Sequence, residues 1–88
     1  MEKENYILQE HVNMPLKAIV TSINKDNTVN VEIHINDLEN GANQIPVSSV
    51  PIMKTVNESE VPNLNHGDNV IIMHLDGSIA KPVIVGKF

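Results

Sequence analysis

The 88-residue chain contains no cysteine, no arginine and no tryptophan, and Tyr6 and Phe88 are its only aromatic residues of the Phe, Tyr or Trp type. Without cysteine, the sequence excludes a disulfide framework, a zinc ribbon and thiol chemistry. The formal net charge is −5 and all six basic residues are lysines, so we expect no basic face for nucleic acid. The scarcity of aromatic rings also removes the platform on which single-stranded bases stack.

Long apolar runs are absent too. No run approaches the roughly 20 residues that a membrane-spanning helix needs. The first five residues carry charges of both signs, and no apolar segment of the signal-peptide type follows them. We therefore expect no membrane-spanning segment and a protein that is made and first located in the cytoplasm.

The apolar residues that are present are mostly Val, Ile and Leu, which favour strands because their branched side chains fit a pleated surface. Residues 16–23 are expected to form a first strand, and the polar run 24–28 a turn. The clearest pattern follows it, where four apolar residues alternate with four polar ones: Val29, Val31, Ile33 and Ile35 with Asn30, Glu32, His34 and Asn36. This alternation predicts a half-buried strand that forms a hairpin with the first.

The remaining segments are shorter. Residues 37–44 are expected to form a loop, and 47–50 a short strand whose flanking Pro46 and Pro51 suit a sheet edge or a bulge. A polar connection over 54–66 leads to a strand over 69–75. Asp76-Gly77 predicts a type I′ hairpin turn before the last strand, 82–86. Before all of these, the spacing of apolar residues predicts an amphipathic helix over 3–14 that ends at Pro15.

The pattern therefore predicts an all-β domain over 16–88, preceded by an N-terminal helical segment over 1–15. Five short strands of this spacing fit a small five-stranded Greek-key barrel of the oligonucleotide/oligosaccharide-binding type, the OB-fold. An SH3-like barrel is the main alternative. Three turn features are expected to be structural: the Gly67-Asp68 turn, in which the Asp side chain accepts backbone N–H groups, the Asp76-Gly77 turn, and Gly86, which would allow a turn or a close approach.

The sequence offers little for catalysis. No two of the four histidines have metal-ligand spacing, and no cysteine accompanies them, so we expect neither a metal nor another cofactor. His34 lies on the polar face of its strand, where an exposed or interfacial side chain is expected, and the same is expected of His74 near a hairpin. The acidic pairs Asp37/Glu39 and Glu58/Glu60 fall in loops, where carboxylates usually face solvent. We therefore do not expect an enzyme.

The order of several short motifs is more informative than any one of them. These are the Ala-Ile-Val-Thr-Ser-Ile strand over 18–23, the alternating strand, Val50-Pro51, Leu64-x-x-Gly67-Asp68-x-Val70, Asp76-Gly77 and the final Lys81-Pro82-Val83-Ile84-Val85-Gly86. In this order, over roughly residues 15–88, the chain resembles the OB-fold barrel domain of phage baseplate spike and hub proteins. That family includes the baseplate assembly protein V of P2-like phages and the spikes of contractile injection systems.

This resemblance implies a structural, non-catalytic module that forms a homotrimer at the hub–spike junction. Its other partners would be tail and baseplate proteins, and its location the virion tail or injection particle after assembly in the bacterial cytoplasm. The sequence ends at Phe88, where a spike would begin, and lacks the His-x-His motif of some spike tips, so we expect an adaptor, a hub component or a truncated fragment instead of a piercing spike. The alternatives are an OB-fold module that binds single-stranded nucleic acid or oligosaccharide, and a small enzyme.

Some side chains are candidates for contacts with other subunits. Tyr6 and Phe88 are scarce aromatics near the two ends of the chain, where they would either anchor a partner or plug the ends of the barrel. The other candidates for oligomer or partner contacts are Ile7, Val12 and His34.

Overall fold

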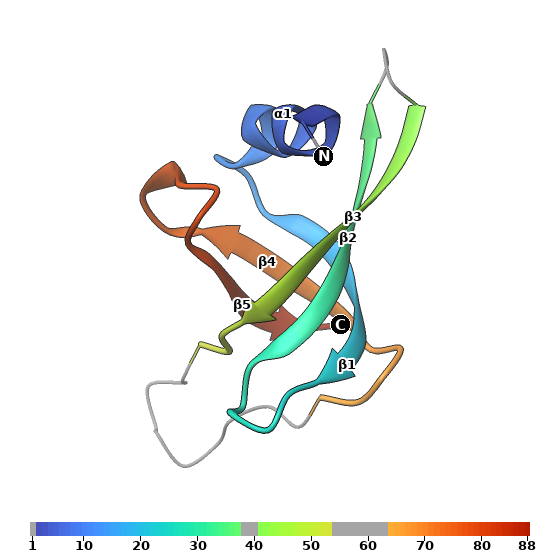
Figure 1. Ribbon diagram of the computed structural model, residues 1–88, viewed down its shortest axis with the longest axis vertical. Coiled ribbons are helices and arrows are strands. Elements are labelled where there is room, and N and C mark those ends of the chain that lie inside the picture. The colour runs from blue at the N-terminus through green and yellow to red at the C-terminus, as the bar shows by residue number, and fades with distance from the viewer. Residues whose placement is uncertain (1, 38–40, 54–63) are drawn as a thin grey trace.

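The computed structural model describes residues 2–37, 41–53 and 64–88, and Figure 1 shows one helix beside a single sheet of antiparallel strands. The sheet has five strands in the order β3-β2-β1-β4-β5 and does not close on itself. The predicted all-β architecture with a short N-terminal helix is confirmed at this level. The elements are α1 (Glu2–His11), β1 (Leu16–Ile23), β2 (Val29–Asp37), β3 (Gly41–Val50), β4 (Asn69–His74), the 3₁₀ turn η1 (Leu75–Gly77) and β5 (Pro82–Lys87).

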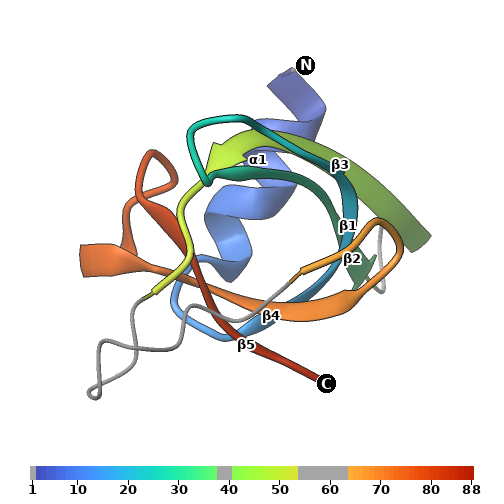
Figure 2. The same ribbon diagram turned by 90° about the horizontal axis from the view of Figure 1, so that it is seen from below.

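The core lies on the inner face of this sheet, and α1 covers one end of it (Figures 1 and 2). The four apolar residues of the alternating pattern on β2 are all buried, as predicted. Each aliphatic side chain of this size stabilises the fold by about 1.5–3 kcal/mol when it is fully buried. The buried cluster includes Ile7, Leu8 and Val12 from α1, Ala18 and Val20 from β1, Val29, Val31, Ile33 and Ile35 from β2, Ile45 and Val50 from β3, Val70 and Ile72 from β4, and Ile84 from β5.

The helix is shorter than the predicted 3–14, because it ends at His11. Residues 12–14 form a turn in which the Met14 N–H donates to the His11 carbonyl at 3.2 Å. The residue before a proline is disfavoured in helical conformation, and Pro15 therefore ends the helix earlier than the apolar spacing suggested.

The predicted loop over 37–44 is wrong at residues 37 and 41–44, and residues 38–40 lie outside the described part of the chain. β2 continues to Asp37 and β3 begins at Gly41, and the two strands pair along this whole length. The segment Gly-Ala-Asn-Gln has little intrinsic preference for a strand, and pairing with β2 imposes the extended conformation instead. The resulting hairpin extends past the body of the sheet in Figure 1. Pro46 lies within β3, opposite Glu32, and β3 is an edge strand, as its prolines predicted.

The Asp76-Gly77 turn after β4 has the predicted type I′ conformation, but it is part of a longer connection between β4 and β5. Asp76 and Gly77 have positive φ angles of 57° and 65°, and the Ser78 N–H donates to the Leu75 carbonyl at 3.0 Å. The turn does not join the strands directly, because the last pair between β4 and β5 is His74 with Pro82. A second turn, in which the Lys81 N–H donates to the Ser78 carbonyl, connects the Asp76-Gly77 turn to β5.

Two further features shape the sheet. The segment after β3 runs alongside β5, where the Ile84 N–H donates to the Pro51 carbonyl at 2.9 Å and the Met53 N–H donates to the Ile84 carbonyl at 2.8 Å. This parallel bridge, centred on Ile52 and Ile84, brings the two edges of the sheet together at one point, and Figure 2 shows the strands curving around toward it.

The second feature is a polar cluster at the bulges of β1 and β3. The Asn30 side-chain amide donates to Ser22 Oγ at 2.8 Å, and its Oδ1 accepts the Ser49 N–H at 3.0 Å. Asn24 and Asn30 also bond to each other through their side chains. The register shifts by one residue beside Asn30 on both neighbouring strands, so this side chain holds the backbone where the regular ladder is interrupted.

Candidate functional site

A shallow pocket lies on β1, β2 and β3 beside the protruding hairpin. Its volume is about 170 Å³, below the roughly 300–1,000 Å³ typical of sites for drug-sized ligands. It is lined by Lys17, His34, Ile35, Asn36, Ala42, Asn43 and Gln44.

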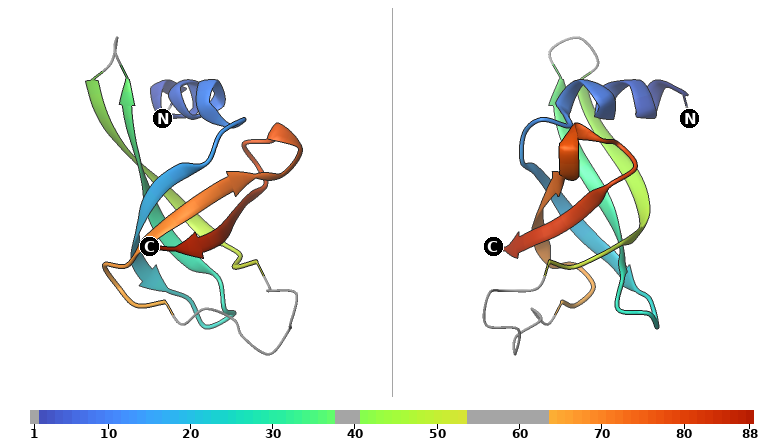
Figure 3. Two further views of the ribbon diagram at one scale, coloured as in Figure 1. Left: turned by 180° about the vertical axis from the view of Figure 1, so that it is seen from behind. Right: turned by 90° about the vertical axis from the view of Figure 1, so that its left-hand side faces the viewer.

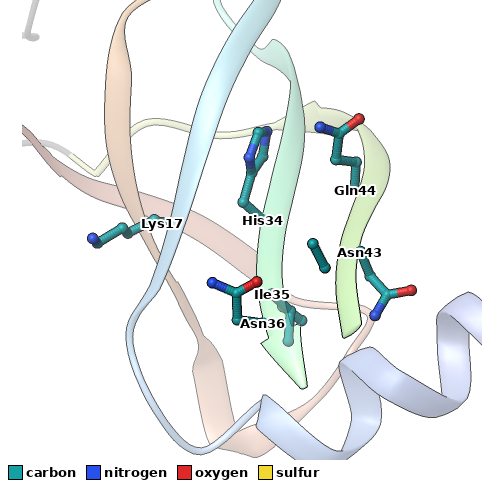
Figure 4. Close-up of a pocket in the computed structure, with 7 residues that line it drawn as sticks. Lys17, His34, Ile35, Asn36, Asn43 and Gln44 are labelled. Atoms are coloured by element: carbon teal, nitrogen blue, oxygen red, sulfur yellow. The ribbon is translucent and has the colours of Figure 1, made fainter. Parts of the chain in front are cut away.

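Strand register gathers the polar side chains of this pocket. His34 and Asn36 take alternate positions on β2, and their side chains point away from the buried face. His34 pairs with Gln44 on β3, and Asn36 pairs with Ala42. On the other side, the pair Ala18–Ile33 places Lys17 next to His34. Figure 4 shows His34 and Gln44 on neighbouring strands, while the Lys17 amine points away from them.

His34 has one close charged neighbour. Its Nε2 lies 3.2 Å from Glu32 Oε1, and both side chains are about one-third exposed, at 37% and 35%. The contact is an ion pair only when the imidazole is protonated, and Nε2 has no hydrogen-bond partner among the described residues. An ion pair at such exposure contributes at most about 1 kcal/mol. The group can therefore orient an imidazole and present amides to a polar ligand, but it pairs no nucleophile with a base.

The predicted contact residues lie in different environments. Ile7 and Val12 are buried in the protein's own core, and in this chain they cover the end of the sheet. Phe88 is 61% exposed, and its backbone N–H donates to the Asn69 carbonyl at 3.0 Å. His34 is partly exposed, as its position on β2 predicted. The side chain of Tyr6 lies outside the described part of the chain. Of the four side chains that are described, Ile7 and Val12 lie in the core while His34 and Phe88 lie at the surface, so these four do not form one exposed site.

Two of the three predicted turn features have a structural explanation. Asp68 Oδ2 accepts the Asn65 N–H at 2.8 Å and lies 3.3 Å from Lys87 Nζ, and these contacts hold the pKa of Asp68 below its usual value. Gly67 has a φ angle of 89°, which glycine adopts at little cost. Gly86 differs from the prediction. It lies within β5 opposite Ile71, and a Cβ there would meet no atom within 4 Å, so neither a turn nor a close approach requires it.

His74 corrects a second prediction, because it is buried and only 7% exposed. Neither ring nitrogen has a hydrogen-bond partner among the described residues, and burial lowers the pKa of the imidazole. Its nearness to a turn suggested exposure. The alternation from Val70 through Ile72 to His74 was the better signal, since it places all three on the inner face of β4.

The described residues were also compared with what a metal site and a membrane-spanning helix require. Among the described residues, no three His, Cys, Asp or Glu side chains come close enough to hold a metal ion. Glu39, Glu58 and Glu60 lie outside those residues, as does the Asp37 side chain. Within the same ranges, no helix has both the length and the apolar character that crossing a membrane requires.

Three comparisons were made with known proteins. Family models, curated proteins and solved structures yield no match to this chain.

Proposed function

We propose that the chain is a structural component of a phage tail, baseplate or related contractile injection machine. In this proposal it is an OB-fold module at the hub–spike junction that associates with copies of itself, as a trimer in the family it resembles, and with other tail proteins. The observation that supports the proposal most is the path of the chain through the sheet.

That path has the Greek-key order. Three strands, β1 to β3, follow one another as neighbours, and β4 returns through a long connection to lie beside β1. The bridge between Ile52 and Ile84 joins the two sheet edges at one point. A five-stranded, partly open Greek-key barrel is the OB-fold architecture, which is the fold that the resemblance implies. The topology therefore supports the OB-fold over the SH3-like alternative.

The surface favours protein contact over nucleic acid. The net charge of −5 and the absence of arginine oppose phosphate binding. Several large apolar side chains are instead exposed, among them Met73 at 43%, Leu75 at 50% and Phe88 at 61%. Single exposed apolar side chains are common on protein surfaces, so these are available to a partner, and it is the charge that opposes nucleic acid.

Co-expression tests this proposal. The chain would be produced together with the proteins encoded by its neighbouring genes, with an affinity tag on this chain alone. We expect it to co-purify with a tail or baseplate protein in a complex of fixed stoichiometry. Neighbouring genes without tail components, together with purification of this chain alone, would contradict the assignment.

The pocket favours a second candidate function, the binding of an oligosaccharide. OB-folds bind ligands on the face formed by their second and third strands, and the pocket lies on β2 and β3 with neutral amides from Asn36 and Gln44. Amides and an imidazole can hydrogen-bond to sugar hydroxyls without a charged partner. Titration of the protein with bacterial cell-wall oligosaccharides, followed by NMR, is expected to shift the His34 and Gln44 signals. Shifts of the same size in a Gln44→Ala variant, or none in the wild type, would exclude this site.

A further inference from the structure

The β3 edge is the least protected part of the sheet. Natural edge strands are shielded by charged side chains, prolines, bulges or a covering element, because their unpaired backbone groups invite another strand. β3 contains no charged residue over its ten positions, Gly41–Val50. Pro46 and the bulge near Ser49 protect only its second half. α1 contacts β3, and Figures 1 and 3 show no other described strand beyond the first half of β3.

The backbone groups on this free edge can be identified from the register. In an antiparallel sheet the N–H and C=O of one residue point to one side, and those of the next residue point to the other. The Val20 N–H donates to the Asp68 carbonyl and the Val20 carbonyl accepts the Gly67 N–H, so Val20 faces away from β2, and the next residue, Ile19, which pairs with Glu32, faces β2. The even-numbered residues of β2 from Glu32 to Asn36 therefore face β1, and the odd-numbered ones face β3. Ile35 pairs with Asn43, and Ile33 with Ile45. The residues between these partners on β3 must therefore point to the free edge.

Those residues are Ala42, Gln44 and Pro46. Pro46 has no N–H to donate, which is consistent with a position that faces solvent. Ala42 and Gln44 each present one N–H and one C=O that the sheet does not use. Both side chains are exposed, and the Gln44 side chain lines the polar pocket.

From this edge we infer an intermolecular contact: β3 of one molecule pairs antiparallel with β3 of a second copy of this chain, over residues 41–45, about a two-fold axis. With Ala42 opposite Gln44 of the partner copy, every free N–H of this segment finds a carbonyl. The absence of charge matters here, because the segment approaches its own copy without the like-charge repulsion expected elsewhere on a chain of net charge −5.

The other sheet edge offers a poorer partner. On β5, the N–H and C=O of Ile84 are already bonded to the segment after β3. Two residues earlier along the same edge, Pro82 has no N–H. If β3 of one copy paired with β5 of the next, some backbone groups of β3 would therefore meet no free partner on β5 and would remain without a hydrogen bond. Pairing of β3 with itself avoids this.

The contact is small, so we expect weak association, in the range in which monomer and dimer are both populated. Because a two-fold contact uses the same surface on both molecules, it produces dimers or other even-numbered assemblies. If the chain also forms a three-membered ring, the contact joins two rings. The inference does not depend on the injection-machine assignment, since it concerns the purified chain alone.

Sedimentation velocity over a concentration series measures the association, and NMR on the same samples identifies the surface. We expect a monomer–dimer equilibrium, with concentration-dependent shifts and slowed exchange at the Ala42 and Gln44 amides. The amides of Asn43 and Ile45 should be protected at every concentration, because they already face β2. Gln44→Pro removes one donor from each copy and should raise the dissociation constant by about tenfold or more.

Circular dichroism checks that the Gln44→Pro chain is folded, and Gln44→Lys is the second variant if it is not, because it adds like charges across the axis and leaves the backbone intact. The matched control is Gln9→Lys, the same exchange at an exposed position of α1, which should leave the association unchanged. The inference is overturned by a strictly monomeric chain, by odd-numbered species only, by shifts at a different surface, or by association that neither Gln44 variant weakens.

Discussion

His74 should make the protein sensitive to mild acid. The imidazole is 7% exposed and its two nitrogens have no partner among the described residues, so the folded protein disfavours the charged form. Burial lowers the pKa of His74 from its usual value of 6.5, whereas the unfolded chain keeps that value. As the pH falls below 6.5, the unfolded chain therefore binds a proton first, and the free energy of unfolding decreases.

The size of the effect follows from one proton. While the unfolded state carries the proton and the folded state does not, the free energy of unfolding falls by at most about 1.4 kcal/mol per pH unit. The loss begins below pH 6.5 and stops once the pH passes the lowered pKa of the folded state. At higher pH the neutral ring still has two buried nitrogens without partners. His74→Leu removes them and should stabilise the protein by about 1–3 kcal/mol.

Urea unfolding followed by far-ultraviolet circular dichroism measures both effects, at a series of pH values from 8 to about 5. We expect His74→Leu to be more stable than the wild type throughout, with a difference that grows as the pH falls. His66→Leu is the matched control, because it makes the same exchange at an exposed histidine in a turn.

The opposite results would refute this reasoning. If wild type and His74→Leu lose stability in parallel between pH 8 and pH 5, the imidazole is hydrated or partnered in the folded protein. A His74→Leu variant that is less stable than the wild type at pH 8 would show that the ring makes a stabilising contact which leucine does not replace.

Three further predictions concern single residues. Asn30→Ala should lower the free energy of unfolding by about 1–3 kcal/mol in urea unfolding, because several backbone and side-chain partners lose their bonds; Asn43→Ala, whose amide bonds only to an exposed carbonyl, should change it by less than about 0.5 kcal/mol, and equal effects would contradict a bracing role for Asn30. Gly77→Ala should lower the thermal midpoint, since its φ is 65° and the backbone of any other residue is strained there; Asn13 Oδ1, 2.8 Å from such a Cβ, is the end of an exposed side chain that can rotate away, so Asn13→Ala should restore little of the loss, and full restoration would show that the side-chain contact is responsible. Asp68→Ala should destabilise the protein at neutral pH and reduce the loss of stability below pH 4, because contacts that lower the pKa of a carboxyl stabilise the fold only while it is charged; an unchanged acid limb of the stability profile would exclude this.

The alternation on β2 allowed the most reliable prediction. A period of two separates inner from outer side chains without any knowledge of the partners, so the buried Val29, Val31, Ile33 and Ile35 and the outward His34 could all be assigned. The same rule applies on β4, where it places His74 inside. His74 was predicted to be exposed because it lies beside a turn, and that prediction was wrong.

The first half of β3 could not be predicted, because its extended conformation comes from pairing with β2 and not from its own composition. Gly41, Ala42 and Asn43 resemble a loop in any local reading of the sequence. The pocket was missed for the same reason. It depends on Gln44 lying opposite His34, and on Lys17 lying next to it on β1, and both relationships are matters of register.

The N-terminal segment shows the same limit. The spacing of Ile7 and Val12 predicted one apolar face of a helix, and that face exists. Spacing alone does not say whether such a face covers the protein's own core or that of a neighbour. In this protein the apolar face of α1 packs on the inner side of the open sheet. That surface is assembled from strands that lie far apart in the sequence.

The return of β4 to the side of β1 also has a consequence for how the chain folds. β1, β2 and β3 are separated by only a few residues in the sequence, so they can pair as a local meander while the rest of the chain is still being synthesised. Their apolar inner face then stays uncovered until β4 and β5 arrive, and the contact between Ile52 and Ile84 is among the last that can form. We therefore expect β1–β4 pairing to limit the folding rate, and an incomplete chain that ends before residue 69 to aggregate through that uncovered face.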